Sequence, residues 1–171
     1  MNKVTRLLVV SLMVAGLCMS ASAARMEEGT QELGISGSAQ DTDVLAYTVE
    51  VGYGYFIAKD LVIGGNVGYE ADDDAWEMNL GANIEYNFDT ESTMVPFVGA
   101  GIRWAYADNG AGDNEDSYVL VPNAGVKFFV VDTLSVGAKV AYYKADVERY
   151  KYEDEWKDNK VALEVETRFY F

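Results

Sequence analysis

Residues 76–88 read W-E-M-N-L-G-A-N-I-E-Y-N-F, and this stretch decides the fold class of the chain. Every second residue, from Trp76 through Leu80 to Phe88, is apolar, and the residues between them are Glu, Asn or Gly. Side chains of a β-strand point alternately to its two faces, so a period of two predicts a strand with one apolar and one polar face. The chain ends on the same pattern in residues 161–171, V-A-L-E-V-E-T-R-F-Y-F, where Thr167 is the one lapse on the apolar face.

The same period recurs along the chain, and no segment after the first 23 residues has the period of a long helix. The expected strands cover residues 32–39, 44–55, 61–70, 76–88, 97–106, 118–128, 134–143 and 161–171. Short connections (56–60, 89–95, 129–133) alternate with longer polar and acidic ones (40–43, 71–75, 107–117, 144–158). A meander with short turns at one end and loops at the other predicts an all-β, eight-stranded antiparallel up-and-down barrel.

The first 23 residues have the pattern of a secretory signal peptide. Lys3 and Arg6 precede an apolar stretch, residues 7–19, and Ala21-Ser22-Ala23 offers small residues for a signal peptidase. The apolar stretch is too short to span a bilayer as a helix. We therefore predict a signal peptide over residues 1–23 and a single barrel domain over residues 24–171.

Composition excludes several classes of function. The formal charge is −15, and removal of the leader, which carries Lys3 and Arg6 and no acidic residue, takes it to −17. So acidic a protein is a poor partner for nucleic acid, because phosphate binding needs clusters of Lys and Arg. The chain has no histidine, the commonest general base and metal ligand, and its single cysteine, Cys18, lies in the leader. We expect no disulfide, cofactor, metal site or catalytic site.

One apolar face fits two kinds of barrel. A soluble lipocalin-like barrel encloses its apolar face around a ligand, whereas a membrane barrel turns that face to lipid and keeps polar groups in the lumen. Ten glycines fall on the polar face, where they would make room for long side chains inside a narrow barrel. Aromatic residues fall at both ends of the apolar face, as in the two girdles of a membrane barrel. These features favour the membrane barrel.

The charged residues of the polar face are then expected inside the barrel. Buried charges are tolerated only when they are paired and hydrogen-bonded. The predicted luminal network contains Glu32, Glu50, Glu77, Glu85, Glu164 and Glu166 together with Arg103, Lys127, Lys139 and Arg168.

With a leader, eight alternating strands, the stretch V-P-F-V-G-A-G-I at residues 95–102 and a terminal aromatic strand, the chain resembles the small outer-membrane β-barrel proteins of Gram-negative bacteria, the OmpX/OmpA-barrel type. The resemblance implies a monomer in the cell outer membrane, surrounded by lipid and lipopolysaccharide, with short periplasmic turns and longer extracellular loops. It also implies recognition by the barrel assembly machinery through Val165, Phe169 and Phe171, a signal from which Thr167 departs.

The sequence leaves three functions open. The first is a structural or surface-interaction role through acidic extracellular loops, without catalysis. The alternatives are a narrow, cation-leaning channel and a periplasmic lipocalin-like binder. Two acidic clusters, residues 72–74 and 108–116, could hold Ca²⁺ or Mg²⁺ through oxygen ligands, but neither has EF-hand spacing, and solvated loops are the expected interpretation.

Overall fold

The computed structural model describes residues 26–41, 45–71, 76–108, 114–148, 150–152 and 155–171. These residues form ten strands: β1 (Gln31–Asp41), β2 (Leu45–Ala58), β3 (Leu61–Ala71), β4 (Trp76–Asn87), β5 (Met94–Asp108), β6 (Asn114–Val131), β7 (Leu134–Ala145), β8 (Tyr150–Tyr152), β9 (Glu155–Lys157) and β10 (Asn159–Tyr170). In this described part of the chain, no helix is long and apolar enough to cross a membrane.

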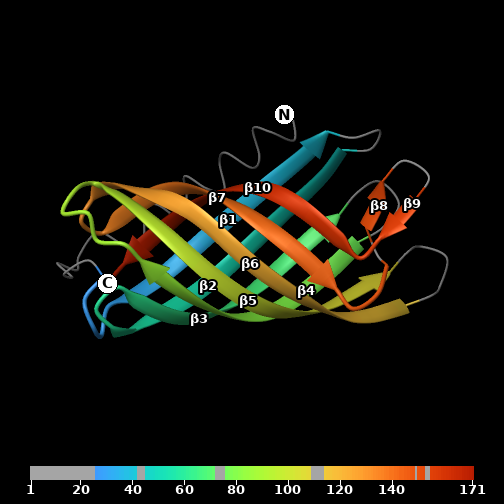
Figure 1. The fold of residues 1–171 in the computed structure, drawn as a ribbon, viewed down its shortest axis with the longest axis horizontal. Helices are drawn as coiled ribbons and strands as arrows, with labels where there is room; N and C mark the ends of the chain where they lie inside the picture. The colour runs from blue at the N-terminus through green and yellow to red at the C-terminus, as the bar shows by residue number, and fades with distance from the viewer. Residues whose placement is uncertain (1–25, 42–44, 72–75, 109–113, 149, 153–154) are drawn as a thin grey trace.

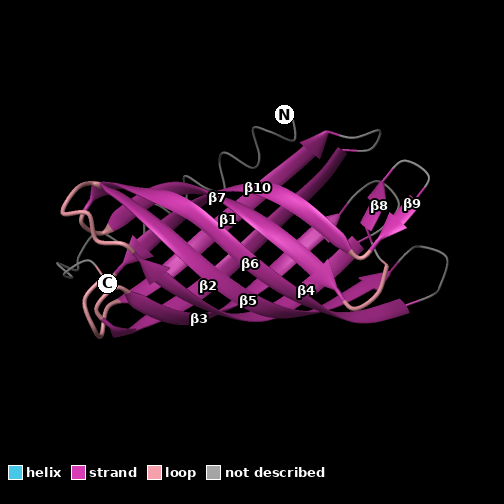
Figure 2. Cartoon of the chain, in the orientation of Figure 1, coloured by secondary structure: helices cyan, strands magenta, loops and turns pink. Residues whose placement is uncertain are grey.

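Eight of the strands close into one antiparallel barrel, in the order β1-β10-β7-β6-β5-β4-β3-β2 (Figures 1 and 2). Each barrel strand pairs with the next barrel strand along the chain, β7 with β10 across the β8–β9 hairpin, and β10 closes the barrel on β1 with Glu32 opposite Tyr170 and Gly37 opposite Val165. The short turns and the C-terminus lie at one end, which we call the short-turn end, and the longer connections lie at the other, the loop end (Figure 1). The eight-stranded up-and-down barrel expected from the sequence is confirmed.

The two faces of the sheet are sorted as the alternation predicts. Leu163 and Val165 of β10 point outward and are 69% and 63% exposed, whereas Glu164 and Glu166 between them are buried inside the barrel. On β4, Leu80 and Ile84 are exposed and Glu85 is 4% exposed. Apolar groups cover the outside and charged groups lie inside, so the favoured membrane barrel is confirmed and the alternative of a soluble lipocalin-like barrel is wrong.

Two expected loops contain more strand than the sequence analysis assigned. Strands β5 and β6 continue to Asp108 and Asn114, which pair, so most of the expected 107–117 loop is a prolonged hairpin. Its Asp, Asn and Ser residues have low strand propensity, but the hydrogen-bonded register of β5 and β6 extends through them. The expected loop over 144–158 contains the hairpin β8–β9, with Tyr150 opposite Lys157. Strands of three residues are too short for alternation to reveal them.

Candidate functional site

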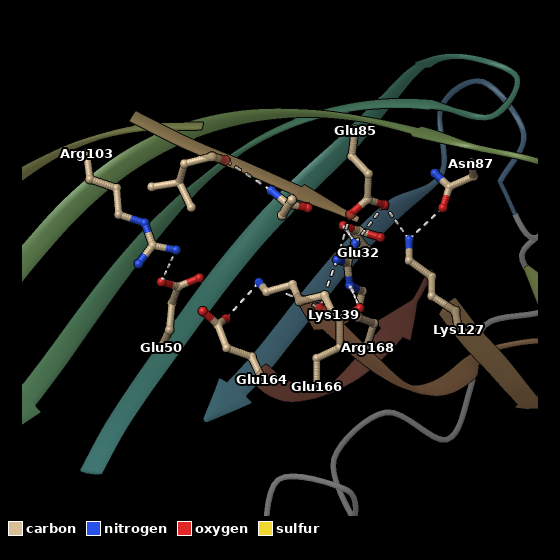
Figure 3. A network of polar contacts seen from close by, with 12 residues as sticks. Glu32, Glu50, Glu85, Asn87, Arg103, Lys127, Lys139, Glu164, Glu166 and Arg168 are labelled. Atoms are coloured by element: carbon tan, nitrogen blue, oxygen red, sulfur yellow. Dashed lines mark hydrogen bonds and ion pairs between the residues drawn. The ribbon is translucent and has the colours of Figure 1, made fainter. Parts of the chain in front are cut away.

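The side chain of Arg168 crosses the lumen of the barrel. Arg168 of β10 donates to both carboxylate oxygens of Glu85 on β4, with Nη1–Oε1 at 3.0 Å and Nη2–Oε2 at 2.7 Å. Strands β4 and β10 lie opposite each other in the strand order, so this bidentate pair spans the barrel (Figure 3). The same guanidinium reaches Glu32 of β1 at 2.8 Å and Glu166 of its own strand at 3.0 Å. Arg168 thus joins three carboxylates from three strands, in the planar fork geometry that arginine favours.

Lys127 of β6 forms a second ion pair with the carboxylate of Glu85. Its fully buried ammonium bonds to Oε1 of Glu85 and, at 2.7 Å, to Oδ1 of Asn87 (Figure 3). The ring of Phe97 lies 5.0 Å from this ammonium and 5.3 Å from the Arg168 guanidinium carbon, within cation–π range of both. Glu85 is therefore bound by two cations, and the aromatic face keeps them desolvated.

Three further ion pairs, made by two cations, lie nearer the loop end. Arg103 of β5 contacts Glu50 of β2 at 2.8 Å, and Lys139 of β7 contacts Glu164 and Glu166 of β10 at 3.1 and 3.8 Å. The Tyr143 hydroxyl donates to Glu164, and its ring lies 5.1 Å from the Arg103 guanidinium carbon. Of the ten predicted residues, nine belong to these groups. Glu77 instead lines a small cavity at the loop end.

Sequence reasoning missed one luminal pair. Lys160 of β10 contacts Glu70 of β3 at 3.0 Å, and its ammonium lies 5.1 Å from the ring of Tyr143 and 4.9 Å from that of Tyr150. Glu70 and Lys160 lie just beyond the core of their apolar runs. Their positions on the polar face were the signal that could have identified them.

Charges inside the barrel do not balance. Five carboxylates in the central groups, those of Glu32, Glu50, Glu85, Glu164 and Glu166, face four cations, and Arg168 is shared by three of the five. Among the described residues, Oε2 of Glu32 and Oε1 of Glu166 are both buried without a hydrogen-bond partner, but Oε1 of Glu166 lies 3.0 Å from Nε of Arg168. A buried charge without compensation is costly, so Glu32 is the least well satisfied carboxylate of the network.

Cavities bounded by the described residues lie within the lumen, and we consider two of them. The larger, about 80 Å³, is bounded by Glu32, Glu50, Glu85, Arg103 and Arg168, among others. The smaller, about 20 Å³, lies beside Glu70, Glu77 and Lys160 at the loop end. A water needs roughly 10–15 Å³ of such volume, so the larger cavity has room for several waters and the smaller for one. Arg103 lines both and separates them.

Two apolar clusters, which were not predicted from the sequence, flank the central ion pairs, one toward the loop end and one toward the short-turn end. One contains Ala105, Val119, Val121, Ala141, Tyr143, Ala145 and Ala162, with Tyr150 of β8 packed against it. The other, at the short-turn end, contains Met26, Phe56, Val62, Val95, Phe129 and Tyr170. Apolar residues at polar-face positions near the strand ends were the available signal. The central ion pairs therefore lie between two apolar clusters, and the Glu70–Lys160 pair lies beside the cluster at the loop end.

Luminal glycines make room for this filling. A Cβ on Gly68 would lie 2.6 Å from the side-chain amide of Asn79, and one on Gly54 would lie 2.7 Å from Cγ of Glu32. A Cβ on Gly81 would lie 2.6 Å from Oδ1 of Asn66 and 3.0 Å from Cγ of Arg103. At these positions a side chain from another strand lies against the backbone, so a residue larger than glycine would force that side chain to shift.

Charged groups outside the barrel strands form local pairs. In the turn between β2 and β3, a hydrogen bond to Asp89 raises the pKa of Lys59, and burial raises the pKa of Asp60. Between β9 and β10, a hydrogen bond from Lys144 holds the pKa of Asp158 below its ordinary value. The acidic cluster at 72–74 lies outside the described residues. In the second cluster, 109–113 are not described, and of its side chains only that of Asp116 is placed; it is exposed.

The residues of the expected C-terminal assembly signal differ in exposure. Val165 and Phe171 are exposed on the outer face, whereas Phe169, at an outward-facing position, is 5% exposed between Leu33 of β1 and Leu134 of β7.

A family model described as "Outer membrane protein beta-barrel domain" matches residues 9–169. No curated protein matches the chain. Among solved structures, the N-terminal β-barrel domain of Pseudomonas aeruginosa OprF is similar, with 17% identity and a TM-score of 0.66 over 84% of this chain and 98% of that one. Neisserial surface protein A has 21% identity and a TM-score of 0.61, covering 83% and 96%. The outer membrane protein OprG of Pseudomonas aeruginosa has 11% identity and a TM-score of 0.58, covering 88% and 99%. At these identities the structures support the fold alone.

Proposed function

The chain belongs to the outer membrane protein β-barrel family, and from that premise we propose that it is a closed barrel with a structural or surface-interaction role. Its place is the cell outer membrane, where the apolar outer face meets lipid. We assign it no catalytic activity, because the chain lacks histidine and the luminal carboxylates are engaged in ion pairs.

The observation that carries the proposal is the Arg168–Glu85 pair that spans the lumen, with an apolar cluster on each side of the charged layer. Opening an ion path would separate these buried charges, and removing one partner from a buried pair costs about 3–5 kcal/mol. Only the rim and the loops then remain for contact with other molecules. The connections at the loop end (40–43, 71–75, 107–117 and 144–158) carry fifteen acidic and four basic residues, so the loop end is acidic by sequence.

Recording current across planar bilayers that contain the purified protein tests the closed lumen. We expect no discrete conductance in potassium chloride for the wild type. The second candidate function, a narrow cation-leaning channel, is favoured by the 80 Å³ cavity and the excess of carboxylates around it. Cation-selective current in the wild type, lost in Glu50→Gln, would replace our proposal with that channel.

The surface role is tested at the loops. Replacing residues 147–156 by a short Gly-Ser turn removes β8, most of β9 and their acidic surroundings, and leaves the barrel strands in place. Cells with the shortened protein should bind less of a cationic probe such as poly-lysine, because an acidic surface attracts cations, and added salt should abolish the difference. Equal binding at low salt by cells with equal amounts of folded protein would argue against this role.

The remaining expectations belong to the same proposal. The protein is exported by the signal peptide of residues 1–23, and the barrel assembly machinery inserts it through Val165, Phe169 and Phe171. It works as a monomer in contact with lipopolysaccharide. Residues 1–23 lie outside the described part of the chain.

A further inference from the structure

The short-turn end of the barrel is covered by a segment that belongs to none of the strands. Residues 26–30 fold into a compact turn in which the Thr30 amide donates to the Glu27 carbonyl at 3.1 Å. The Gly29 amide donates to the Phe56 carbonyl at 2.9 Å, and the Phe56 amide donates to the Thr30 carbonyl at 2.9 Å. The turn is therefore fastened to the end of β2.

The Met26 side chain fills the mouth of the barrel. Met26 is 2% exposed and packs in the apolar cluster with Phe56, Val62 and Val95, beside the rings of Phe129 and Tyr170. The centroids of those two rings lie 5.1 Å apart, so the rings pack against each other within the cluster. The five other members of the cluster belong to strands, so Met26 is the one that can leave without breaking a strand pairing.

The backbone of this turn is held in an uncommon conformation. Met26 has a φ of 58° and Gly29 a φ of 91°, both in the left-handed region. Glycine adopts that region freely, but a methionine there is strained and depends on its surroundings. The strain at Met26 favours release of the turn once its apolar contacts are lost.

The turn also connects to the charged layer. The Asp60 amide donates to the Met26 carbonyl at 2.9 Å, and the Asp60 carbonyl accepts from the backbone and side-chain amides of Asn87 at 2.9 and 3.2 Å. Oδ1 of Asn87 in turn accepts from Lys127, which is bound to Glu85. The Asp60 turn thus lies between the segment and the ion pairs of the lumen.

We propose that residues 26–30 form a detachable plug. Met26 leaves and re-enters the short-turn mouth while the barrel stays folded, and its departure opens the apolar cluster, down to the layer of Lys127, to small water-borne solutes from that side. Among the described residues, three backbone hydrogen bonds to β2 and the Asp60 turn and the buried side chains of Met26 and Thr30 hold the plug, whereas β1 and β2 share a register of eleven residue pairs. Elements with so few contacts open locally without global unfolding.

Thiol labelling tests the plug because the chain has one cysteine, Cys18, which can be replaced. Val95→Cys reports on the space behind Met26, and Ala141→Cys, in the apolar cluster of the loop end, is the matched reporter away from it. Met26→Gly removes the buried side chain of the plug and is compatible with the left-handed backbone. Met26→Leu keeps an apolar side chain at the same position. A small methanethiosulfonate reagent should label Val95→Cys at least tenfold faster with Met26→Gly than with Met26→Leu, and Ala141→Cys at the same rate in both.

A second measurement separates a detachable plug from a fixed one. With native Met26, the labelling rate of Val95→Cys should change little with urea below the unfolding transition, as expected for local opening, whereas that of Ala141→Cys should follow global unfolding. Equal urea dependence for both reporters, or equal labelling of Val95→Cys with Met26→Gly and Met26→Leu, would overturn the proposal. The closed-lumen proposal is tested separately, because the Arg168–Glu85 pair still spans the lumen after the plug has left.

Discussion

Single glycines show how tightly the lumen is filled. A Cβ on Gly125 of β6 would lie 2.4 Å from the Ala138 carbonyl oxygen and 2.6 Å from Cζ of Phe97, whereas one on Gly34 of β1 has no neighbour closer than 3.8 Å. Overpacking costs about 1–3 kcal/mol, while alanine in an unstrained strand position is about 0.5–1 kcal/mol better than glycine. We expect Gly125→Ala to lower the free energy of unfolding by the first amount and Gly34→Ala to raise it slightly. Urea unfolding in lipid vesicles measures both, and equal effects would contradict the packing argument.

The charges of the network differ in what they contribute. Glu85→Gln leaves Lys127 buried with Asn87 as its remaining bonded partner and removes the bidentate partner of Arg168. Loss of one side of a buried pair costs about 3–5 kcal/mol. Glu32→Gln removes a carboxylate from a network with one too many, and Arg168 keeps Glu85 and Glu166. In the same unfolding assay, we expect Glu85→Gln to lower the free energy of unfolding by about 3–5 kcal/mol and Glu32→Gln to lower it by less than about 1 kcal/mol. Equal losses would mean that the excess charge is already neutralised.

At the scale of elements, a pH-dependent contact fastens the β8–β9 hairpin. Lys144 lowers the pKa of Asp158, the Asn159 side-chain amide contributes in the same direction, and the Ala145 amide donates to the Asp158 carbonyl at 2.7 Å. Because the folded state favours the carboxylate, this contribution is complete at neutral pH and is lost as the pH falls below 3.8 through the lowered pKa. The hydrogen-exchange protection factor of the Ala145 amide should fall over that range. With Lys144→Met the protection should be lower at neutral pH and change less on acidification. If the protection factor of the Ala145 amide fell equally in the wild type and in Lys144→Met, the titrating group would not be the Lys144–Asp158 pair.

The seam between β1 and β10 is the shortest contact of the barrel. Its register covers six residue pairs, whereas β5 and β6 share fifteen. Two hydrogen bonds between Gln31 and Phe171, at 2.8 and 3.0 Å, close its end. Fewer pairs mean a lower free energy of local opening, so we expect amides of the seam, such as Leu33 and Ile35, to exchange faster than those in the middle of β5 and β6. Hydrogen exchange followed by NMR in micelles measures this order, and uniform protection around the barrel would refute it.

The sequence predicted the strands and their inward and outward faces because alternation is a local property. Leu163 and Glu164 identify their faces from their neighbours alone. The partner of Arg168 was not predictable in this way, because Glu85 lies 83 positions away and alternation says nothing about which strands lie opposite each other. The β8–β9 hairpin and the turn at Met26 were missed since segments of three to five residues are too short for a period to appear.

For the whole molecule, the height of the apolar band follows from the same strands. About ten residues at about 3.3 Å each, tilted near 45°, cover roughly 24 Å of hydrocarbon. Val165 lies near the middle of β10, and Val161 lies near its loop end, opposite the exposed Tyr142 of β7. Both are more than half exposed on the outer face, so a new side chain at either position enters lipid instead of protein.

An arginine at these two positions therefore measures the depth of the membrane around the barrel. Arginine on the lipid face costs about 2–4 kcal/mol at the midplane and about 0–1 kcal/mol near the interface. We expect Val165→Arg to lose the larger amount and Val161→Arg the smaller in urea unfolding from vesicles, with Val165→Leu as the control for shape. In detergent micelles the difference should shrink, because a micelle adapts to a charge more readily than a bilayer does. Equal losses at the two positions in vesicles would mean that the bilayer does not centre on the middle of β10, and the height derived from the alternation would then be wrong.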